Sequence, residues 1–421
     1  MVDVWLPYGR TEICSRIPTR NFLGMIEPKQ KQAITDVKAE ILRALDNPIG
    51  GKSLSEFVGK GSTVSIVVDD VTRSTPSKMM ISPLLEKLNQ LGVSDEDIMV
   101  IFGCGTHRAV KPEEGRELLG EDIADRVRTL SHDCHAEDHV YLGTTKKHGT
   151  KVYVNKAFAE ADARILTGDV ELHYYAGYGG GRKSVLPAVS SFDTIQHNHA
   201  LTLHPDARTG VLDGNPVHED MAEAAKIANV DFILNVVTNR EGEIAEVFAG
   251  DLEQAFSQGV QSVTEMCKVP ISRRSDIVVV SPGGHPTDIN LYQAYKAIDN
   301  ALASVKRGGV IVLAAECPEG YGNEVFFEWM RESKDLKTIQ KELRKHFDLG
   351  GYKAYRLLTA LQKAKIILVS TMPDYYAVNV FGLRTARAVN DALKEAFEIT
   401  GKNAKIWAMP HGHVTLPMLE A

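Results

Sequence analysis

Three apolar runs of strand length, each followed by a polar loop, constrain the fold of this chain most strongly. Residues 62–68 (STVSIVV), 97–102 (DIMVIF) and 163–167 (ARILT) are expected to form buried strands. An amphipathic helix is expected between the first two runs, at 79–91, and the connections are short. Strand, loop, helix and strand in this order are typical of a parallel α/β sheet.

The same order of elements begins again after residue 275. Strands are expected at 276–280, 310–314, 365–369 and 405–409, and helices at 290–305, 323–362 and 383–400, with the second helix broken at Gly350–Gly351. The basic stretch 267–274 (CKVPISRR) is interpreted as a linker, and residues 1–30 as one short strand with loops.

A chain of 421 residues is too long for a single ordinary core. We therefore predict an α/β protein of two α/β domains with mainly parallel sheets and an active-site cleft between them. The expected boundaries are 1–268 for the N-terminal domain and 275–403 for the C-terminal domain. A last strand and tail, 404–421, can return to the first domain.

Composition excludes several classes of protein. A net charge of −7 and a pI near 6.1 argue against a nucleic-acid binder, whose binding surface would be basic. No apolar run reaches the roughly 18 residues that a membrane span needs, and the N-terminus lacks the pattern of a signal peptide. Five scattered cysteines fit reduced thiols better than a disulfide framework. We expect a cytoplasmic protein that binds neither membrane nor nucleic acid.

Polar residues that could bind a ligand or take part in catalysis follow the first two strands. Asp70, Thr72 and Arg73 lie in the motif DDxTR, where the arginine can hold a carboxylate or phosphate with two hydrogen bonds. A surface turn with a local salt bridge is the alternative. His107, in GTHR after the second strand, is an imidazole at the same edge of the sheet. A single loop histidine is more often structural, but its place beside the first loop favours a function.

The stretch 171–199 concentrates glycine, lysine and histidine. Gly179, Gly180 and Gly181 lack a Cβ and let a ligand approach the backbone. Lys183 can pair with a phosphate or, if desolvated, act as a nucleophile. The spacing matches neither a Walker A loop nor a dinucleotide fingerprint. Together with His173, the stretch indicates a bound, charged cofactor.

Two histidines end this stretch, His197 and His199, in an expected helix. Residues i and i+2 of a helix do not face each other, so only one of them is expected to serve a shared site. In a later helix Gln293 and Lys296 are i and i+3 and share a face. That face can line a binding site, or it can be ordinary helix surface.

The segment His132-Asp-Cys134-His135-x-x-x-His139 has the composition of a zinc site. No second pair of ligands follows at a motif spacing, so a polar loop is the simpler interpretation. A zinc-dependent hydrolase built on these residues stays as one alternative function. A non-catalytic nucleotide- or sugar-acid-binding protein is the other.

Five motifs in order resemble one known family. DDxTR, GTHR, HYYAGYGGGRKSVLP, NHA at 198–200 and DINLYQAYKA are similar to motifs of the nickel-pincer-nucleotide-dependent lactate racemases, a family of 2-hydroxyacid racemases and epimerases. The similarity extends over most of the chain. It implies an isomerase that acts by proton-coupled hydride transfer to and from a pyridinium nucleotide, through a 2-keto acid intermediate. Its expected partners are a small 2-hydroxy acid and the enzymes that make the cofactor.

The resemblance also implies a role for each matching residue. The cofactor, a pyridinium-3-thioamide-5-thiocarboxylic acid mononucleotide, would be attached at Lys183 and hold Ni(II), with His199 as the protein's nickel ligand. Carbon, two sulfurs and one imidazole nitrogen suit the square-planar field of Ni(II). The other expected roles are acid–base catalysis by His107 and His173; substrate binding by Arg73, Gln293 and Lys296; and cofactor binding by Asp70, Thr72, Arg73 and Gly179 to Gly181.

Some details of the resemblance leave a choice. Asp70 is expected either to position Arg73 or to touch the cofactor. An aromatic residue of the second domain is expected near the cofactor, and Tyr352 and Tyr355 are the candidates.

Overall fold

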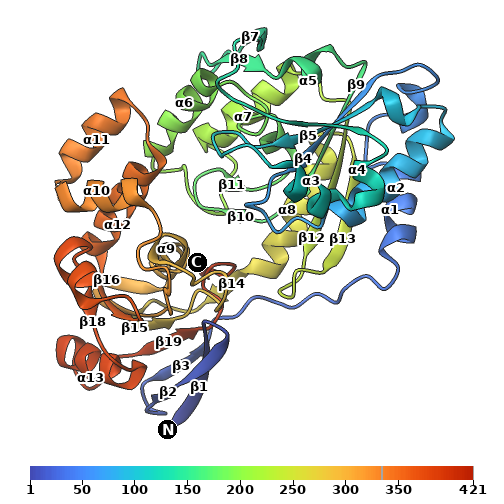
Figure 1. Cartoon of the computed structure of the whole chain (residues 1–421). Helices are drawn as coiled ribbons and strands as arrows, with labels where there is room; N and C mark the ends of the chain where they lie inside the picture. The colour runs from blue at the N-terminus through green and yellow to red at the C-terminus, as the bar shows by residue number, and fades with distance from the viewer. Residues whose placement is uncertain (333–334, 421) are drawn as a thin grey trace. The chain divides into compact units, whose positions relative to one another are not determined.

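The computed structural model describes residues 1–332 and 335–420 of the chain and divides them into two compact units. The central unit is Gln30–Glu265, and the terminal unit joins Met1–Lys29 to Met266–Ala421. Each unit is built on a six-stranded sheet (Figure 1).

The sheet of the central unit has the order β13-β12-β9-β4-β5-β6. Its strands are β4 (Val64–Asp69), β5 (Ile98–Gly103), β6 (Arg128–Ser131), β9 (Ala163–Asp169), β12 (Phe232–Thr238) and β13 (Ile244–Gly250). All neighbours are parallel except the antiparallel pair β12–β13. The chain runs from β4 to β5 and β6 on one side and then returns to β9 on the other side of β4. The direction of the connections therefore reverses between β4 and β9.

Helices cover both faces of this sheet, which is why β4 is a continuous apolar run. α1 (Val37–Asp46) and α2 (Ser77–Gln90) lie on one face, and α7 (Pro216–Ile227) and α8 (Gln254–Cys267) on the other (Figure 1). The remaining elements are α3 (Pro112–Leu119), α4 (Glu121–Ala124), α5 (Lys156–Glu160), α6 (Phe192–Ala200), and the antiparallel pairs β7 (Val140–Thr144) with β8 (Lys151–Val154) and β10 (Leu172–His173) with β11 (Gly177–Tyr178). Single helical turns lie at Leu54–Glu56, Asp95–Asp97, Gly181–Ser184 and Leu201–Leu203.

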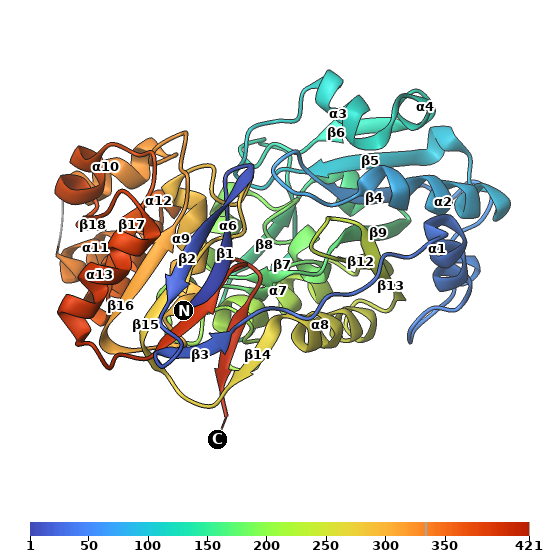
Figure 2. The same ribbon diagram turned by 90° about the horizontal axis from the view of Figure 1, so that it is seen from below.

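The sheet of the terminal unit has the order β18-β17-β16-β15-β19-β3 and is parallel throughout. Its strands are β3 (Phe22–Met25), β15 (Ser275–Val280), β16 (Val305–Ala314), β17 (Lys365–Val369), β18 (Arg384–Thr385) and β19 (Ile406–Met409). The hairpin β1 (Val2–Tyr8) and β2 (Thr11–Ile17) shares one apolar core with α13 (Val389–Thr400) on one face (Figure 2). The other elements are α9 (Leu291–Ala301), α10 (Glu324–Glu332), α11 (Leu336–Lys345), α12 (Leu349–Lys363), a π-helical turn (Tyr375–Val380), and the parallel pair β14 (Lys268–Ile271) with β20 (Leu416–Leu419).

The α/β class with mainly parallel sheets is confirmed, but several elements differ from expectation. Residues 1–30 hold three strands, the supposed linker contains β14, β13 is additional, and the helix expected at 383–400 starts at Val389 after β18. The break expected at Gly350–Gly351 lies a few residues earlier, at 346–348 between α11 and α12, and both glycines lie in the first turn of α12. A Cβ on Gly351 would lie 2.7 Å from the Trp329 ring, so these glycines let α10 approach α12 closely. Residues 333–334 of that expected helix lie outside the described residues.

The division into units also differs from the boundaries expected from the sequence. Residues 1–29 belong to the terminal unit, because β3 pairs with β19 and the β1–β2 hairpin packs on the sheet that β19 belongs to. The last strands, β19 and β20, pair with β15, β3 and β14 within the same unit. In the described part of the chain, no helix combines the length and apolar character needed to cross a membrane.

Candidate active site

The candidate residues of the central unit gather at the carboxyl edge of its sheet, around the reversal between β4 and β9. Open α/β sheets bind ligands at such a reversal. Asp70 and Arg73 follow β4, His107 follows β5, and His173 follows β9. Electrostatic interactions connect His199 with both Lys183 and His107, so the groups from these separate segments lie within reach of one another.

Asp70 holds the imidazole of His107. The Asp70 carboxylate lies 2.7 Å from His107 Nδ1, and Thr72 donates to the same carboxylate from its backbone nitrogen at 2.9 Å and its hydroxyl at 2.6 Å. Burial opposes ionisation of Asp70, but the hydrogen bonds from His107 and Thr72 prevail and its pKa lies below the usual value. An ionised Asp70 can only accept, so His107 carries its proton on Nδ1 and has a lone pair on Nε2.

The side chain of Arg73 contacts Glu171. Its guanidinium lies 3.4 Å from the carboxylate of Glu171, whereas the hydrogen bonds of Asp70 go to His107 and Thr72. The Arg73 side chain is 34% exposed and that of Glu171 is 50% exposed. A contact of this length and exposure is weak, so Arg73 can exchange Glu171 for the carboxylate of a ligand.

His173 has the opposite hydrogen-bond polarity to His107. It lies in β10 and is buried, and the backbone nitrogen of Ala176 donates to its Nδ1 at 3.3 Å. A nitrogen that accepts carries no proton, so the neutral ring carries its proton on Nε2. The Tyr175 ring packs edge-on against His173, with ring centroids 4.4 Å apart.

His199 and Tyr175 form a second buried pair. The Tyr175 hydroxyl lies 2.9 Å from His199 Nε2, and the ring also interacts with the backbone of Ile195, one helical turn earlier in α6. Burial, reinforced by the positive charge of Lys183, lowers the pKa of His199 to about 3. The ring is therefore neutral, with a lone pair on Nε2 that faces a hydroxyl. Metal-binding histidines characteristically donate their second nitrogen to a carbonyl in this way, so His199 fits a metal ligand.

His197, in the same helix, faces elsewhere. It is exposed, and its Nε2 lies 3.1 Å from the carbonyl of His148.

Lys183 is a buried amine on the single turn Gly181–Ser184. Its side chain is 9% exposed, and no carboxylate in the described residues forms an ion pair with it. Its pKa lies well below the usual range, mainly because of burial and then because of the charge of Arg73. A neutral lysine amine is a nucleophile, so Lys183 fits a covalent attachment point.

The glycine triplet is required by the fold of the protein itself. Gly180 and Gly181 have φ angles of +74° and +53°, which disfavour other residues. A Cβ on Gly181 would lie 2.8 Å from the Phe256 ring, and one on Gly180 would lie 3.0 Å from Val170. Close packing within the protein therefore already accounts for these two glycines.

The candidates of the terminal unit lie on α9. The backbone nitrogen of Gln293 donates to the capping side chain of Asn290 at 3.0 Å. Lys296 lies near the buried Lys353, whose pKa is lowered well below its usual range by burial and then by Lys296. Of the two aromatic candidates, Tyr352 is fully buried, whereas Tyr355 is partly exposed.

The histidines at 132–139 have structural partners. His132 lies 2.9 Å from the Ser190 carbonyl through Nε2 and 3.4 Å from the Asn155 side chain through Nδ1, and burial lowers its pKa to about 4. His139 bonds to the carbonyl of Ala136 at 2.7 Å. Within residues 1–332 and 335–420, no three His, Cys, Asp or Glu side chains converge on a metal position.

Three residues of the site were not predicted from the sequence. Glu171 faces Arg73; Tyr175 contacts His173 and His199; and Asp69, whose pKa burial raises, accepts from the Thr75 hydroxyl at 2.5 Å. All three lie inside or beside the quoted motifs, which is the one signal that the sequence offers for them.

Known lactate racemases are similar to this chain over almost its full length. Family models described as the lactate racemase N-terminal and C-terminal domains match residues 8–210 and 271–416. A lactate racemase of Thermoanaerobacterium thermosaccharolyticum is 34% identical over 420 residues, 98% of this chain and 98% of that protein. A lactate racemase of Lactiplantibacillus plantarum is 32% identical over 420 residues, 98% and 99% of the two chains.

Two solved structures are similar to this chain in fold. The lactate racemase apoprotein of T. thermosaccharolyticum superposes with a TM-score of 0.91 at 34% identity, covering 99% of this chain and 100% of that one. A Thermotoga maritima protein with 21% identity and a TM-score of 0.66, over 93% of this chain and 100% of its own, shares the fold. This chain belongs to the lactate racemase family, and with it to the isomerases.

Proposed function

We propose that this protein racemises lactate or a closely related 2-hydroxy acid. The observation that carries the proposal is the opposite polarity of His107 and His173, one with a lone pair on Nε2 and the other with a proton there. Racemisation requires one group that takes the hydroxyl proton and another that returns a proton on the opposite face. Two imidazoles at one sheet edge, hydrogen-bonded in opposite ways, suit that exchange.

The Cα hydrogen of a 2-hydroxy acid is poorly acidic and therefore difficult to remove as a proton, and its removal as a hydride needs an acceptor that no side chain provides. The proposed nickel-pincer nucleotide, when bound, would accept and return this hydride, so that the substrate passes through a 2-keto acid. Lys183 would attach the nucleotide through its neutral amine, and His199 would ligate Ni(II) through Nε2, with the Tyr175 hydroxyl giving way. Thr72 and Gly179 to Gly181 stay predictions as cofactor-binding residues.

The protein's own groups orient the substrate and move its protons. Arg73 would bind the carboxylate in place of Glu171, with the two parallel hydrogen bonds that a guanidinium offers. His107, held by Asp70, would take the hydroxyl proton of one enantiomer, and His173 would return a proton to form the other. From the family resemblance we extend substrate binding to Gln293 and Lys296 on α9.

Two measurements test this proposal. The protein is produced together with the cofactor-making enzymes, and the peptide that contains Lys183 is examined by mass spectrometry. A mass increase on Lys183 and one equivalent of nickel are expected. An unmodified Lys183 in a catalytically active preparation would contradict the proposal, and zinc without nickel would favour the hydrolase.

The second measurement separates a racemase from a binding protein. A chiral 2-hydroxy acid labelled with deuterium at C2 is incubated with the matured enzyme. The proposed mechanism scrambles the stereochemistry and largely retains the label, whereas a binding protein leaves both unchanged. A panel of 2-hydroxy acids then identifies the side chain that the site prefers.

A further inference from the structure

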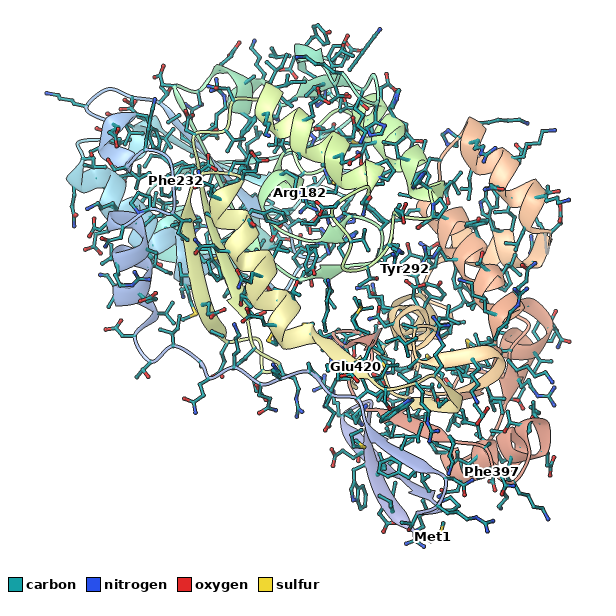
Figure 3. The ribbon with its side chains drawn as sticks, turned by 180° about the vertical axis from the view of Figure 1, so that it is seen from behind. Met1, Arg182, Phe232, Tyr292, Phe397 and Glu420 are labelled. Carbon is teal, nitrogen blue, oxygen red and sulfur yellow. The ribbon has the colours of Figure 1, made fainter. Side chains whose placement is uncertain are left out.

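Arg182 is a buried cation without an anionic partner. It is 2% exposed and forms no ion pair with any carboxylate in the described part of the chain. Arginine is rarely buried in this way, because removing its charge from water is costly unless the charge is paired. Burial lowers the pKa of Arg182 to about 9, which still leaves the guanidinium mainly charged at neutral pH. Figure 3 labels it in the interior of the central unit.

Uncharged groups of the protein satisfy this guanidinium. Nε donates to His218 Nδ1 at 3.0 Å, Nη2 donates to the Ala176 carbonyl at 2.8 Å, and Nη1 donates to the Gly180 carbonyl at 3.0 Å. Cζ of the guanidinium lies over the Phe256 ring, 4.4 Å from its centroid. Arg182 thereby connects its own loop to α7, through His218, and to α8, through Phe256.

The glycine motif takes its shape around this side chain. The positive φ angles of Gly180 and Gly181 form the bend next to Arg182, and the Gly180 carbonyl accepts from its guanidinium. The missing Cβ of Gly181 lets the Phe256 ring pack against the loop. The glycines and the arginine of GYGGGRK therefore form one structural unit, in which the loop closes around a guanidinium.

Lys183, the next residue, is fixed by the same arrangement. Its backbone nitrogen donates to the Gly180 carbonyl at 3.2 Å, and its carbonyl accepts from Ala188 at 3.2 Å. Ser184 donates through its hydroxyl to the Thr167 carbonyl of β9 at 3.1 Å. The backbone that carries the Lys183 amine is thus attached on one side to the Arg182 loop and on the other to the central sheet.

We propose that Arg182 is a positioning residue, whose guanidinium holds the loop 176–184 so that the Lys183 amine stays buried at the carboxyl edge of the sheet. The proposal rests on the proposed function, in which Lys183 carries the cofactor. It assigns Arg182 no contact with substrate or cofactor, because its side chain is buried among protein groups.

The burial of Lys183 and the charges around it determine the pKa of its amine. Burial is the main reason that its pKa is low; Arg73 lowers it further, Glu171 raises it, Arg182 lowers it and Asp69 raises it. Loosening the loop would hydrate the amine, and removing Arg182 would also remove a like charge. Both changes raise the pKa of Lys183 and reduce the fraction of nucleophilic amine.

The test measures the reactivity of Lys183 in the cofactor-free protein. Acetic anhydride acylates neutral amines, and peptide mapping by mass spectrometry gives the rate at each lysine as a function of pH. Arg182→Lys keeps the charge but loses the planar fork, and Arg182→Met loses both. Arg164→Lys is the matched control, because Arg164 donates to the Ala159 carbonyl at 2.7 Å in the same unit, away from this loop. The exposed Lys60 is the internal reference for the reagent.

In both Arg182 variants we expect the pH of half-maximal acylation at Lys183 to rise by about one unit or more, with no change in Arg164→Lys. A merely structural role would lower the melting temperature without moving this midpoint. Folded Arg182 variants with an unchanged midpoint would therefore overturn the proposal, as would an equal shift in the control.

A second pair of variants covers the case in which Arg182 cannot be replaced without unfolding. His218→Gln keeps an acceptor for Arg182 Nε, and His218→Leu removes it. We expect a raised midpoint in the leucine variant and a smaller change in the glutamine variant. Equal midpoints in the two variants would overturn the proposal.

Cofactor loading separates this inference from the proposed function. After co-expression with the maturation enzymes, Arg182→Lys should carry several-fold less adduct on Lys183 than the wild type. An undiminished adduct in the variant overturns the positioning role. A wild type that is active without any adduct overturns the proposed function instead, whatever the acylation profile.

Discussion

The Asp70 carboxylate lies 2.7 Å from Nδ1 of His107, one of the two candidate catalytic histidines. The buried carboxylate fixes the tautomer of the imidazole, and Thr72 holds the carboxylate in turn. This arrangement leaves the lone pair of His107 on Nε2 and would stabilise the imidazolium if His107 takes a proton there, as proposed.

Asp70→Asn tests this arrangement. An asparagine amide can donate to Nδ1, which moves the imidazole proton to Nε2 and removes the base. We expect kcat to fall by about two to four powers of ten with the fold intact. Thr72→Val, which removes only the hydroxyl bond to Asp70, should cost much less. A circular dichroism spectrum of each variant controls for folding, and near-normal turnover by Asp70→Asn would contradict the assigned role.

Replacing either His107 or His173 alone should impair both directions of the reaction. Each would be the base in one direction and the acid in the other, so His107→Asn and His173→Asn should both lose racemisation from either enantiomer, by about a hundredfold or more. Enantiomers have equal free energy, so kcat/KM must be equal in the two directions for the wild type. Chiral chromatography starting from each pure enantiomer measures all four rates. The same equality holds for every variant, so a folded single-histidine variant that keeps near-normal kcat/KM would contradict the mechanism.

Sequence alone predicts the strands that build this site but not its hydrogen bonds. β4, β5 and β9 are continuous apolar runs because helices cover both faces of their sheet. Their order places Asp70, His107 and His173 at one edge. Which partner each side chain selects depends on distances of a few tenths of an ångström, which no spacing encodes.

Other errors have equally specific causes. The strands β1 and β2 mix apolar with charged and polar residues, and β3 is short and pairs with β19 near the other end of the chain, so local pattern underestimates all three. The break predicted at Gly350 and Gly351 from the poor helix propensity of glycine lies at 346–348, because the missing side chains of these glycines make room for α10 in the first turn of α12. Tertiary packing outweighs local propensity in both cases.

His132 should make the protein less stable in acid. Burial lowers its pKa in the folded state to about 4, below the value near 6.5 of the unfolded chain, so the unfolded state binds more protons between these values. The stabilisation is fully present above pH 6.5 and is lost as the pH falls through 4, by at most about 3 kcal/mol. Urea unfolding of wild type and His132→Asn across this range measures it, with the exposed His197→Gln as control. Parallel stability curves for wild type and His132→Asn would contradict the prediction.

Gly181→Ala should destabilise the protein more than Gly214→Ala. Gly181 and Gly214 have φ angles of +53° and +75°, so both substitutions incur the backbone strain of about 1–3 kcal/mol. A Cβ at Gly214 meets nothing within 4 Å, whereas one at Gly181 would lie 2.8 Å from the Phe256 ring. Denaturant unfolding of the two variants isolates the cost of that contact. Equal losses would show that Phe256 moves aside freely and that the loop is less tightly packed than the structure indicates.

Arg73 and Glu171 should affect substrate binding in opposite directions. Arg73→Lys keeps a positive charge but loses the bidentate fork, and a lost charge-assisted hydrogen bond of about 1.5–3 kcal/mol would raise KM by roughly ten- to a hundredfold. Glu171→Gln removes the carboxylate that lies 3.4 Å from Arg73 and competes with the substrate for it, so KM should fall. Steady-state rates with the matured enzyme measure both changes, and the variant Glu96→Gln, remote in sequence on an exposed turn, controls for the loss of one negative charge. A KM that rises in Glu171→Gln would mean that Glu171 supports Arg73 in the substrate complex and does not compete for it.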